Sequence, residues 1–155
     1  MDDSIIGQTA PSFILQSSDG LMFDSKSLHG KWRVIFFYSM NLSPICKRGC
    51  LTFKEQYNLF DSAGCSIIGI GPGTLEEVKD FKDYVGELPF PILADNERKV
   101  GIAYNIPLHL GKFPTKSSFV IGPDNKIHHV YDWFFRPRRH VAKVLAHISK
   151  VVGGD

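Results

Sequence analysis

A continuous run of β-branched and aromatic residues at positions 32–38 most limits how this chain can fold. Such runs are typical of strands that are buried on both faces, in the centre of a sheet covered by helices. A helix start follows, because Ser43 is a favoured N-cap residue and Pro44 is favoured at the first helical position. From Cys46 onward apolar residues recur at spacings of three and four, which predicts an amphipathic helix to about Phe60. We therefore expect a buried strand, a short loop and a helix packed on the sheet.

The rest of the chain alternates apolar runs with turn signals. The Ser18-Asp19-Gly20 turn predicts a hairpin near the N-terminus, and the Gly122–Asn125 turn predicts a late one. Strands that alternate with helices early in the chain favour a parallel centre, to which the hairpins add antiparallel strands. The prediction is an α/β fold with a mixed sheet flanked by helices on both faces. Strands are expected at 12–16, 21–23, 65–70, 118–121 and 126–131, helices at 75–85 and along the C-terminal segment, and a loop at 105–116.

Length and composition exclude several classes of protein. With 155 residues, the chain has room for one domain of ordinary size, which we place at 1–155. The net charge of +2 is too small to favour nucleic-acid binding, and no apolar stretch is long enough to span a membrane. The acidic start of the chain lacks the apolar region of a secretory leader. Three cysteines argue against a disulfide framework, so we expect a reducing, cytoplasmic location.

Cys46 is the best candidate for a reactive group. It falls in the first turn of the predicted helix, where unpaired N–H groups and the helix dipole lower the pKa of a thiol. Lys47 and Arg48 add positive charge beside it. Because the thiolate is the nucleophilic form, these features favour reactivity at Cys46. The alternative is that Cys46 is a small buried side chain in the core of the fold.

Cys50 and Cys65 are weaker candidates for a reactive role. Cys50 follows Cys46 by one helical turn, on the same face, where Cβ atoms lie ~5–6 Å apart. A disulfide needs Cβ atoms ~3.5–4.5 Å apart, so the first turn would have to loosen before the two sulfurs joined. Gly49 weakens that turn. Cys50 is therefore either a partner for Cys46 or a packing residue, and we expect Cys65, at the start of a buried strand, to belong to the core.

Several segments together resemble the peroxiredoxins, and within them the monomeric Q-type branch related to bacterioferritin comigratory protein. These are GQTAPSFIL at 7–15, FFY with the cysteine loop that follows it, IIGIG at 67–71, FPILAD at 90–95 and KSSFVI with DNKI between 116 and 127. The resemblance implies a thioredoxin-like fold over most of the chain. It also implies peroxide reduction, in which a thiolate becomes a sulfenic acid, a second thiol condenses with it, and thioredoxin or a similar donor restores the enzyme. No metal or organic cofactor is implied.

The resemblance assigns roles to individual residues. Cys46 matches the attacking cysteine, and Ser43 matches the threonine whose hydroxyl contacts the thiolate and the peroxide. Lys116 matches an arginine that stabilises the thiolate, and it keeps the charge without the planar fork of donors. Ser39 and Gly49 replace the family's proline and glutamate. Leu51 replaces the resolving cysteine of many relatives, so Cys50 comes one residue early.

We expect a thiol-dependent peroxidase that acts on hydrogen peroxide or alkyl hydroperoxides with a thioredoxin-like reductant. It would act as a monomer or weak homodimer, without nucleic acid or membrane. The alternative is a redox sensor or partner-binding protein on the same fold, with poor peroxidase activity. A third reading is a scaffold that binds partners through residues 133–140. There, the cluster Arg136-Pro137-Arg138-Arg139-His140 follows three aromatic residues and opposes the dipole of the last helix. We expect His140 and His147 on the surface.

Overall fold

A computed structural model describes residues 3–109, 111, 113–133 and 136–153. Seven strands form one sheet in the order β2-β1-β5-β4-β3-β8-β9, and β6 and β7 form a separate pair. The strands are β1 (Ile14–Ser17), β2 (Met22–Asp24), β3 (Trp32–Phe37), β4 (Cys65–Pro72), β5 (Ile92–Asp95), β6 (Leu108–His109), β7 (Phe113–Pro114), β8 (Ser117–Ile121) and β9 (Ile127–Asp132). The α-helices are α1 (Pro44–Glu55), α2 (Tyr57–Ser62), α3 (Leu75–Val85), α4 (Lys99–Ala103) and α5 (Pro137–Val152), and 3-10 turns lie at Asp3–Ile5, Ser25–Leu28 and Asn96–Arg98.

The sheet is mixed, as predicted. Strand β3, in the interior of the sheet, pairs in parallel with β4, which pairs in parallel with β5. On its other edge β3 pairs antiparallel with β8, and β8 forms a hairpin with β9. The N-terminal hairpin of β1 and β2 joins the sheet through antiparallel pairing of β1 with β5. The predicted α/β class and both hairpins are confirmed.

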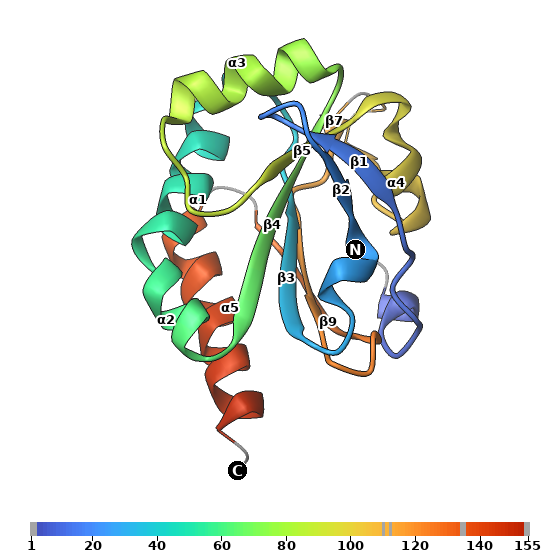
Figure 1. Cartoon of the computed structure of the whole chain (residues 1–155), viewed down its shortest axis with the longest axis vertical. Helices are drawn as coiled ribbons and strands as arrows, with labels where there is room; N and C mark the ends of the chain where they lie inside the picture. Colours follow the sequence, from blue (N-terminus) through green and yellow to red (C-terminus); the bar gives the residue numbers. More distant parts are fainter. Residues whose placement is uncertain (1–2, 110, 112, 134–135, 154–155) are drawn as a thin grey trace.

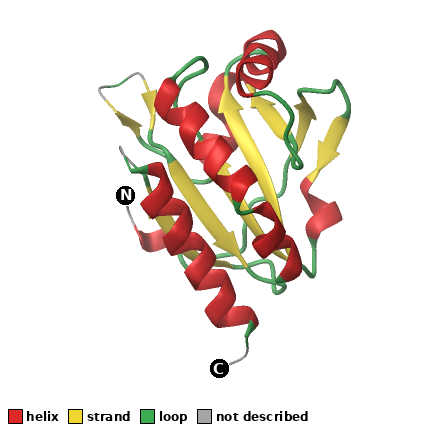
Figure 2. Cartoon of the chain, turned by 90° about the vertical axis from the view of Figure 1, so that its left-hand side faces the viewer, coloured by secondary structure: helices red, strands yellow, loops and turns green. Residues whose placement is uncertain are grey.

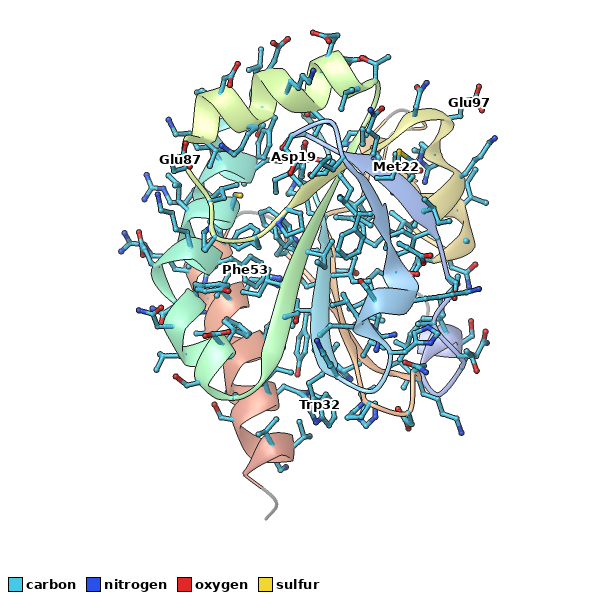
Figure 3. All side chains as sticks on the ribbon, in the orientation of Figure 1. Asp19, Met22, Trp32, Phe53, Glu87 and Glu97 are labelled. Atoms are coloured by element: carbon cyan, nitrogen blue, oxygen red, sulfur yellow. The ribbon has the colours of Figure 1, made fainter. Side chains whose placement is uncertain are left out.

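Helices cover both faces of the sheet, and each face has its own apolar core. Helices α1, α2, α3 and α5 lie together on one side, while α4 and the first 3-10 turn lie on the other (Figure 1). Figure 2, viewed from the side of the larger helix group, shows these helices in front of the sheet. The core beneath them includes Phe53 of α1, which stacks on Phe36 of β3 at 4.7 Å between ring centroids. Figure 3 shows Phe53 between its helix and the sheet. This packing fixes the start of α1 against the end of β3.

The helix predicted from Pro44 to Phe60 was wrong in one respect, because the chain breaks it at Gln56. Gln56 has a ψ of 4°, outside the helical region, and α2 begins at the next residue. The Thr52 hydroxyl donates to the Arg48 carbonyl at 2.7 Å, and hydroxyl bonds of this kind bend helices. The bend lets Phe53 and Phe60 reach the same core, with ring centroids 5.8 Å apart.

Two other expectations also need correction. Residues 105–116 are not all loop, because β6 and β7 pair through Leu108 with Pro114 and His109 with Phe113. His140 does not lie on the surface: its side chain is 5% exposed, whereas His147 is half-buried. Phe134 and Phe135, two of the aromatic residues before the basic cluster, lie outside the described residues. No helix among the described residues is long and apolar enough to cross a membrane.

Candidate active site around Cys46

Cys46 lies in the first turn of α1, as the sequence predicts. Pro44 begins the helix, and Ser43 is its N-cap, with the extended backbone that an N-cap adopts. The Ser43 hydroxyl accepts a hydrogen bond from the backbone N–H of Cys46 at 3.3 Å. The Cys46 side chain is 1% exposed and faces the core on the helix side of the sheet. Its sulfur therefore sits at the positive end of a helix of three turns.

Ser39 supplies a contact to the thiol that sequence reasoning missed. Its Oγ atom lies 3.7 Å from Sγ of Cys46, and the Ser39 side chain is itself buried. From the sequence, Ser39 was noted only as a departure from the family's proline. The available signal was its position two residues after the end of β3, at the edge of the sheet where the loop to α1 begins. A hydroxyl at this distance can donate to a thiolate.

The loop between β3 and α1 is tied to the end of β4. The Tyr38 hydroxyl donates to Oδ1 of Asn41 at 2.8 Å, and Nδ2 of Asn41 donates to the Pro72 carbonyl at 2.9 Å. Gly71 makes room for this arrangement, because a Cβ there would overlap the Tyr38 hydroxyl. Burial raises the pKa of Tyr38, and the nearby thiols Cys50 and Cys46 raise it further, so its hydroxyl stays protonated as a donor.

Cys50 is held deep in the core. Its side chain is 0% exposed, and burial, followed by the neighbouring Cys46, raises the pKa of the Cys50 thiol strongly. The helix is continuous from Cys46 to Cys50, so the two Cβ atoms keep the one-turn spacing that is too long for a disulfide. A bond between them requires the first turn to open. Cys65 is buried in β4 opposite Trp32, with a pKa raised to about 12 by burial, in agreement with its predicted place in the core.

Lys116 directly precedes β8 and is half-buried. Its carbonyl accepts a hydrogen bond from the backbone N–H of Trp133 at 2.9 Å. Ser118 lies opposite Phe36 in the sheet, and side chains alternate along a strand, so Lys116 lies on the same side of the sheet as Phe36 and Cys46. The structure thus brings Cys46, Ser43, Cys50 and Lys116 to one side of the sheet. Cys46 is in direct contact with Ser43 and Ser39.

Trp133 explains why a glycine stands where the family has a glutamate. A Cβ at Gly49 would overlap the six-membered ring of Trp133, so the helix can approach the indole only without a side chain there. The indole also stacks on His140, with ring centroids 5.5 Å apart. Nε2 of His140 is 2.7 Å from the Ser118 hydroxyl. Burial lowers the pKa of His140 to about 3, with a smaller effect from Lys143, so the ring is neutral.

Where the family has a charged glutamate, this chain has Gly49 packed against the indole of Trp133. The glutamate that the family places here would have to occupy the volume of the indole. Nε1 of Trp133 is buried and has no hydrogen-bond partner among the described residues. An uncharged indole therefore lies against the active-site helix at the position where the family has a carboxylate.

Comparison with known proteins identifies the group to which this arrangement is similar. A model of the AhpC/TSA family matches residues 6–130. Peroxiredoxin Q, chloroplastic, from Sedum lineare is 30% identical over 141 residues, which are 90% of this chain and 75% of that protein. A putative peroxiredoxin Q, chloroplastic, from Oryza sativa subsp. indica is 29% identical over 140 residues. The match covers 90% of this chain but 64% of the rice protein, so the chain spans just under two thirds of that relative.

Solved structures share the fold. Peroxidoxin BcpB from Mycobacterium tuberculosis superposes with a TM-score of 0.84 at 24% identity, covering 94% of this chain and 97% of that one. A Xanthomonas campestris bacterioferritin comigratory protein, described for its alkyl peroxide reduction activity, has a TM-score of 0.80 at 23% identity. It covers 90% of this chain and 92% of its own. The predicted thioredoxin-like architecture is confirmed.

Proposed function

Because the chain belongs to the AhpC/TSA family, as its resemblance to the peroxiredoxins predicted, we propose that it is a thiol-dependent peroxidase with Cys46 as nucleophile. One observation carries the proposal. Cys46 lies in the first turn of α1, with its N–H capped by Ser43 and its sulfur 3.7 Å from the Ser39 hydroxyl. A thiol at a helix N-terminus beside a hydroxyl donor is the environment in which a thiolate is stabilised.

The proposed reaction begins with attack of the Cys46 thiolate on one oxygen of a hydroperoxide. The S–O bond forms as the O–O bond breaks, so sulfur is oxidised by two electrons and the peroxide is reduced. The leaving alkoxide or hydroxide takes a proton and departs as alcohol or water. Cys46 is left as a sulfenic acid.

Three neighbours support this step. Ser39 would donate its hydroxyl to the thiolate. Ser43 holds the first turn through its bond to the Cys46 N–H, which leaves its own hydroxyl hydrogen for the peroxide. Lys116 would supply positive charge for the oxygen that departs, and its place on the Cys46 side of the sheet supports that role.

The second half of the cycle requires another thiol. We propose that a thioredoxin-like donor, or a similar external thiol, condenses with the sulfenic acid, releases water and then yields the reduced enzyme. Cys50 remains a candidate for an internal resolving role. Its burial and its raised pKa argue that the first turn must open before Cys50 can act.

We also propose one domain over residues 1–155 in a reducing, cytoplasmic compartment, as a monomer or weak homodimer without nucleic acid or membrane. The sheet supports one domain, because β1 and β2 near the N-terminus share it with β8 and β9. Three free, buried cysteines support a reducing compartment.

The alternative function is a redox sensor or partner-binding protein with little turnover. The observation that favours it is the loss of the family's proline, glutamate and arginine at Ser39, Gly49 and Lys116. K116R separates the two functions, because an arginine fork should raise the rate of peroxide reduction only if the site already reacts.

The experiment mixes fully reduced protein with one equivalent of hydrogen peroxide and follows its intact mass over time. Gain of one oxygen atom indicates a sulfenic acid, and loss of two hydrogen atoms indicates a disulfide. C46S should abolish both changes, whereas C50S should still gain one oxygen per chain. C65S, which removes another buried cysteine, is the matched control and should behave as the parent protein does. Full peroxide turnover by C46S would refute the proposal.

A further inference from the structure

A surface hollow of about 510 Å³ lies between the first turns of α1 and α5. Its lining from α1 is Pro44, Ile45 and Arg48, and from the start of α5 it is Arg136, Pro137, Arg138 and Arg139. These residues include Ile45, which directly precedes Cys46 in the active-site helix. The hollow therefore adjoins the turn that carries the reactive thiol, and the function proposed above does not use it.

The hollow is strongly cationic. Four arginines line it, although the whole chain carries a net charge of only +2. Within the described part of the chain none of the four forms an ion pair with a carboxylate. Guanidinium groups bind carboxylates through paired, nearly parallel hydrogen bonds. Four unpaired guanidinium groups around one hollow thus favour a ligand with more than one carboxylate.

The end of α5 adds to this preference for an anion. Arg136 is its N-cap, and no side chain among the described residues caps the helix. Its first turn holds Arg138 and Arg139 and no acidic residue, so fixed cations oppose the positive end of a helix of 16 residues. The start of α1 also faces the hollow. A bound anion would offset the charge of both helix ends and of the arginines together.

The reductive half of the cycle needs a thiol from outside the core. Leu51 stands at the family's resolving position, and Cys50 is 0% exposed within a continuous helix. A ligand held beside Ile45 and Arg48 would be next to the first turn when that turn loosens. Leu42, in the loop before it, has a φ of 62° and an exposed side chain, a strained conformation for a bulky residue that favours rearrangement there.

We propose that the hollow binds the carboxylates of a small acidic thiol of the glutathione class, and that this thiol resolves the Cys46 sulfenic acid. The inference rests on the proposed peroxidase function and names its co-substrate. The volume suits a small molecule, since ligand sites span roughly 300–1,000 Å³. A protein donor would instead need a contact area of about 800 Å² per partner.

The chemistry balances with two such thiols. The first attacks the sulfenic sulfur, an S–S bond forms as the S–O bond breaks, and water leaves. The second attacks the sulfur of the bound thiol and releases the Cys46 thiol together with the symmetrical disulfide. The two electrons that the peroxide removed are returned by the two thiols.

The test measures the two half-reactions separately. One equivalent of hydrogen peroxide first forms the sulfenic acid, which intact mass records. Glutathione, neutral 2-mercaptoethanol or cationic cysteamine is then added, and the loss of sulfenic acid is timed. Each rate is divided by the rate of the same thiol with a small disulfide, which removes differences in intrinsic reactivity. We expect glutathione to exceed cysteamine by tenfold or more, and high salt to reduce this preference.

Variants of the arginines test whether the hollow causes the preference for glutathione. R138Q/R139Q should lower the corrected glutathione rate by about tenfold, equivalent to ~1.4 kcal/mol, because charge-assisted hydrogen bonds are lost. R48Q, on the other helix, should lower it in the same direction. K126Q/K150Q removes two exposed cations elsewhere and should leave the preference intact.

The outcomes separate the two proposals. If neither a sulfenic acid nor a disulfide within the chain forms, the peroxidase function fails. If a disulfide within the chain forms at once, the peroxidase function stands and this inference is overturned, because no external thiol is needed to resolve Cys46. If the sulfenic acid forms but reacts equally with all three thiols, or equally in R138Q/R139Q, the hollow is not a thiol site. Reduction by thioredoxin alone, with no response to glutathione, would likewise overturn this inference while leaving the peroxidase function standing.

Discussion

His140 should make the stability of the fold depend on pH. Its ring is buried among Phe53, Trp133 and Tyr131, bonded to Ser118 and close to Lys143. Burial lowers the pKa of His140 to about 3 from the ordinary value of 6.5. The folded state therefore keeps the ring neutral at pH values where the unfolded chain protonates it.

The sign of the effect follows from linkage. A lowered pKa means that the unfolded state binds more protons between 6.5 and about 3, so stability falls as the pH falls through that window. At about pH 5 the ordinary pKa is about 1.5 units higher than the solution pH. At ~1.36 kcal/mol per unit, His140 costs about 2 kcal/mol of unfolding free energy relative to about pH 8. The cost changes little if the folded pKa is anywhere below about 4, because the folded ring is then still largely neutral.

The assay is urea unfolding at about pH 8 and about pH 5, for the parent protein and H140Q. Other groups titrate in both proteins, so only the difference between their pH effects reports on His140. On acidification the free energy of unfolding of H140Q should fall by about 2 kcal/mol less than that of the parent. The glutamine amide retains a hydrogen-bonding group for Ser118. H29Q, at an exposed histidine, is the matched control and should follow the parent. Equal pH effects in H140Q and the parent would show that folded His140 accepts the proton, against the reasoning from burial.

Three further predictions concern the active-site helix and the cysteines. G49A should destabilise the fold by ~1–3 kcal/mol by overpacking against Trp133, and thermal melting should show W133L recovering part of the loss. S39A should slow sulfenic acid formation about tenfold, since a donor to the thiolate contributes ~1.5 kcal/mol, measured by rapid mixing with peroxide. In the folded protein at about pH 8, Cys50 and Cys65 should resist iodoacetamide because burial shields both and raises their pKa values; peptide mapping checks this.

For each of these predictions one outcome would contradict the reasoning. A gain in melting temperature in G49A would mean that the indole moves aside at no cost. An unchanged rate in S39A would mean that the hydroxyl does not donate to the thiolate. Rapid alkylation of Cys50 in the folded protein would show that α1 opens on the time scale of the reaction.

Local sequence signals predicted the elements that position Cys46. Ser43 and Pro44 marked the start of α1, and the predicted helix at 75–85 is α3, which begins with a capping box of Thr74 and Glu77. These features depend on residues close together in the chain. The break at Gln56 was missed because the apolar spacing continues across it.

Long-range contacts at the site were less accessible to sequence reasoning. The need for a glycine at position 49 depends on how closely α1 approaches Trp133 at the end of β9, which neither segment encodes alone. The burial of His140 did have a signal. It precedes Val144 by four residues and Ile148 by eight, so it belongs to the buried stripe of α5. Because histidine is polar, we expected His140 on the surface instead.

The contact between Gly49 and Trp133 also restricts how this sequence can change over generations. Restoring the family's acidic residue at position 49 would introduce a side chain into the space of the indole, and shrinking the indole alone would leave a cavity beside His140. Either single step is harmful, so the two positions have to change together or not at all. A protein descended from this chain could regain the family's glutamate only through a less stable intermediate. We therefore expect Gly49 and Trp133 to be inherited as a pair.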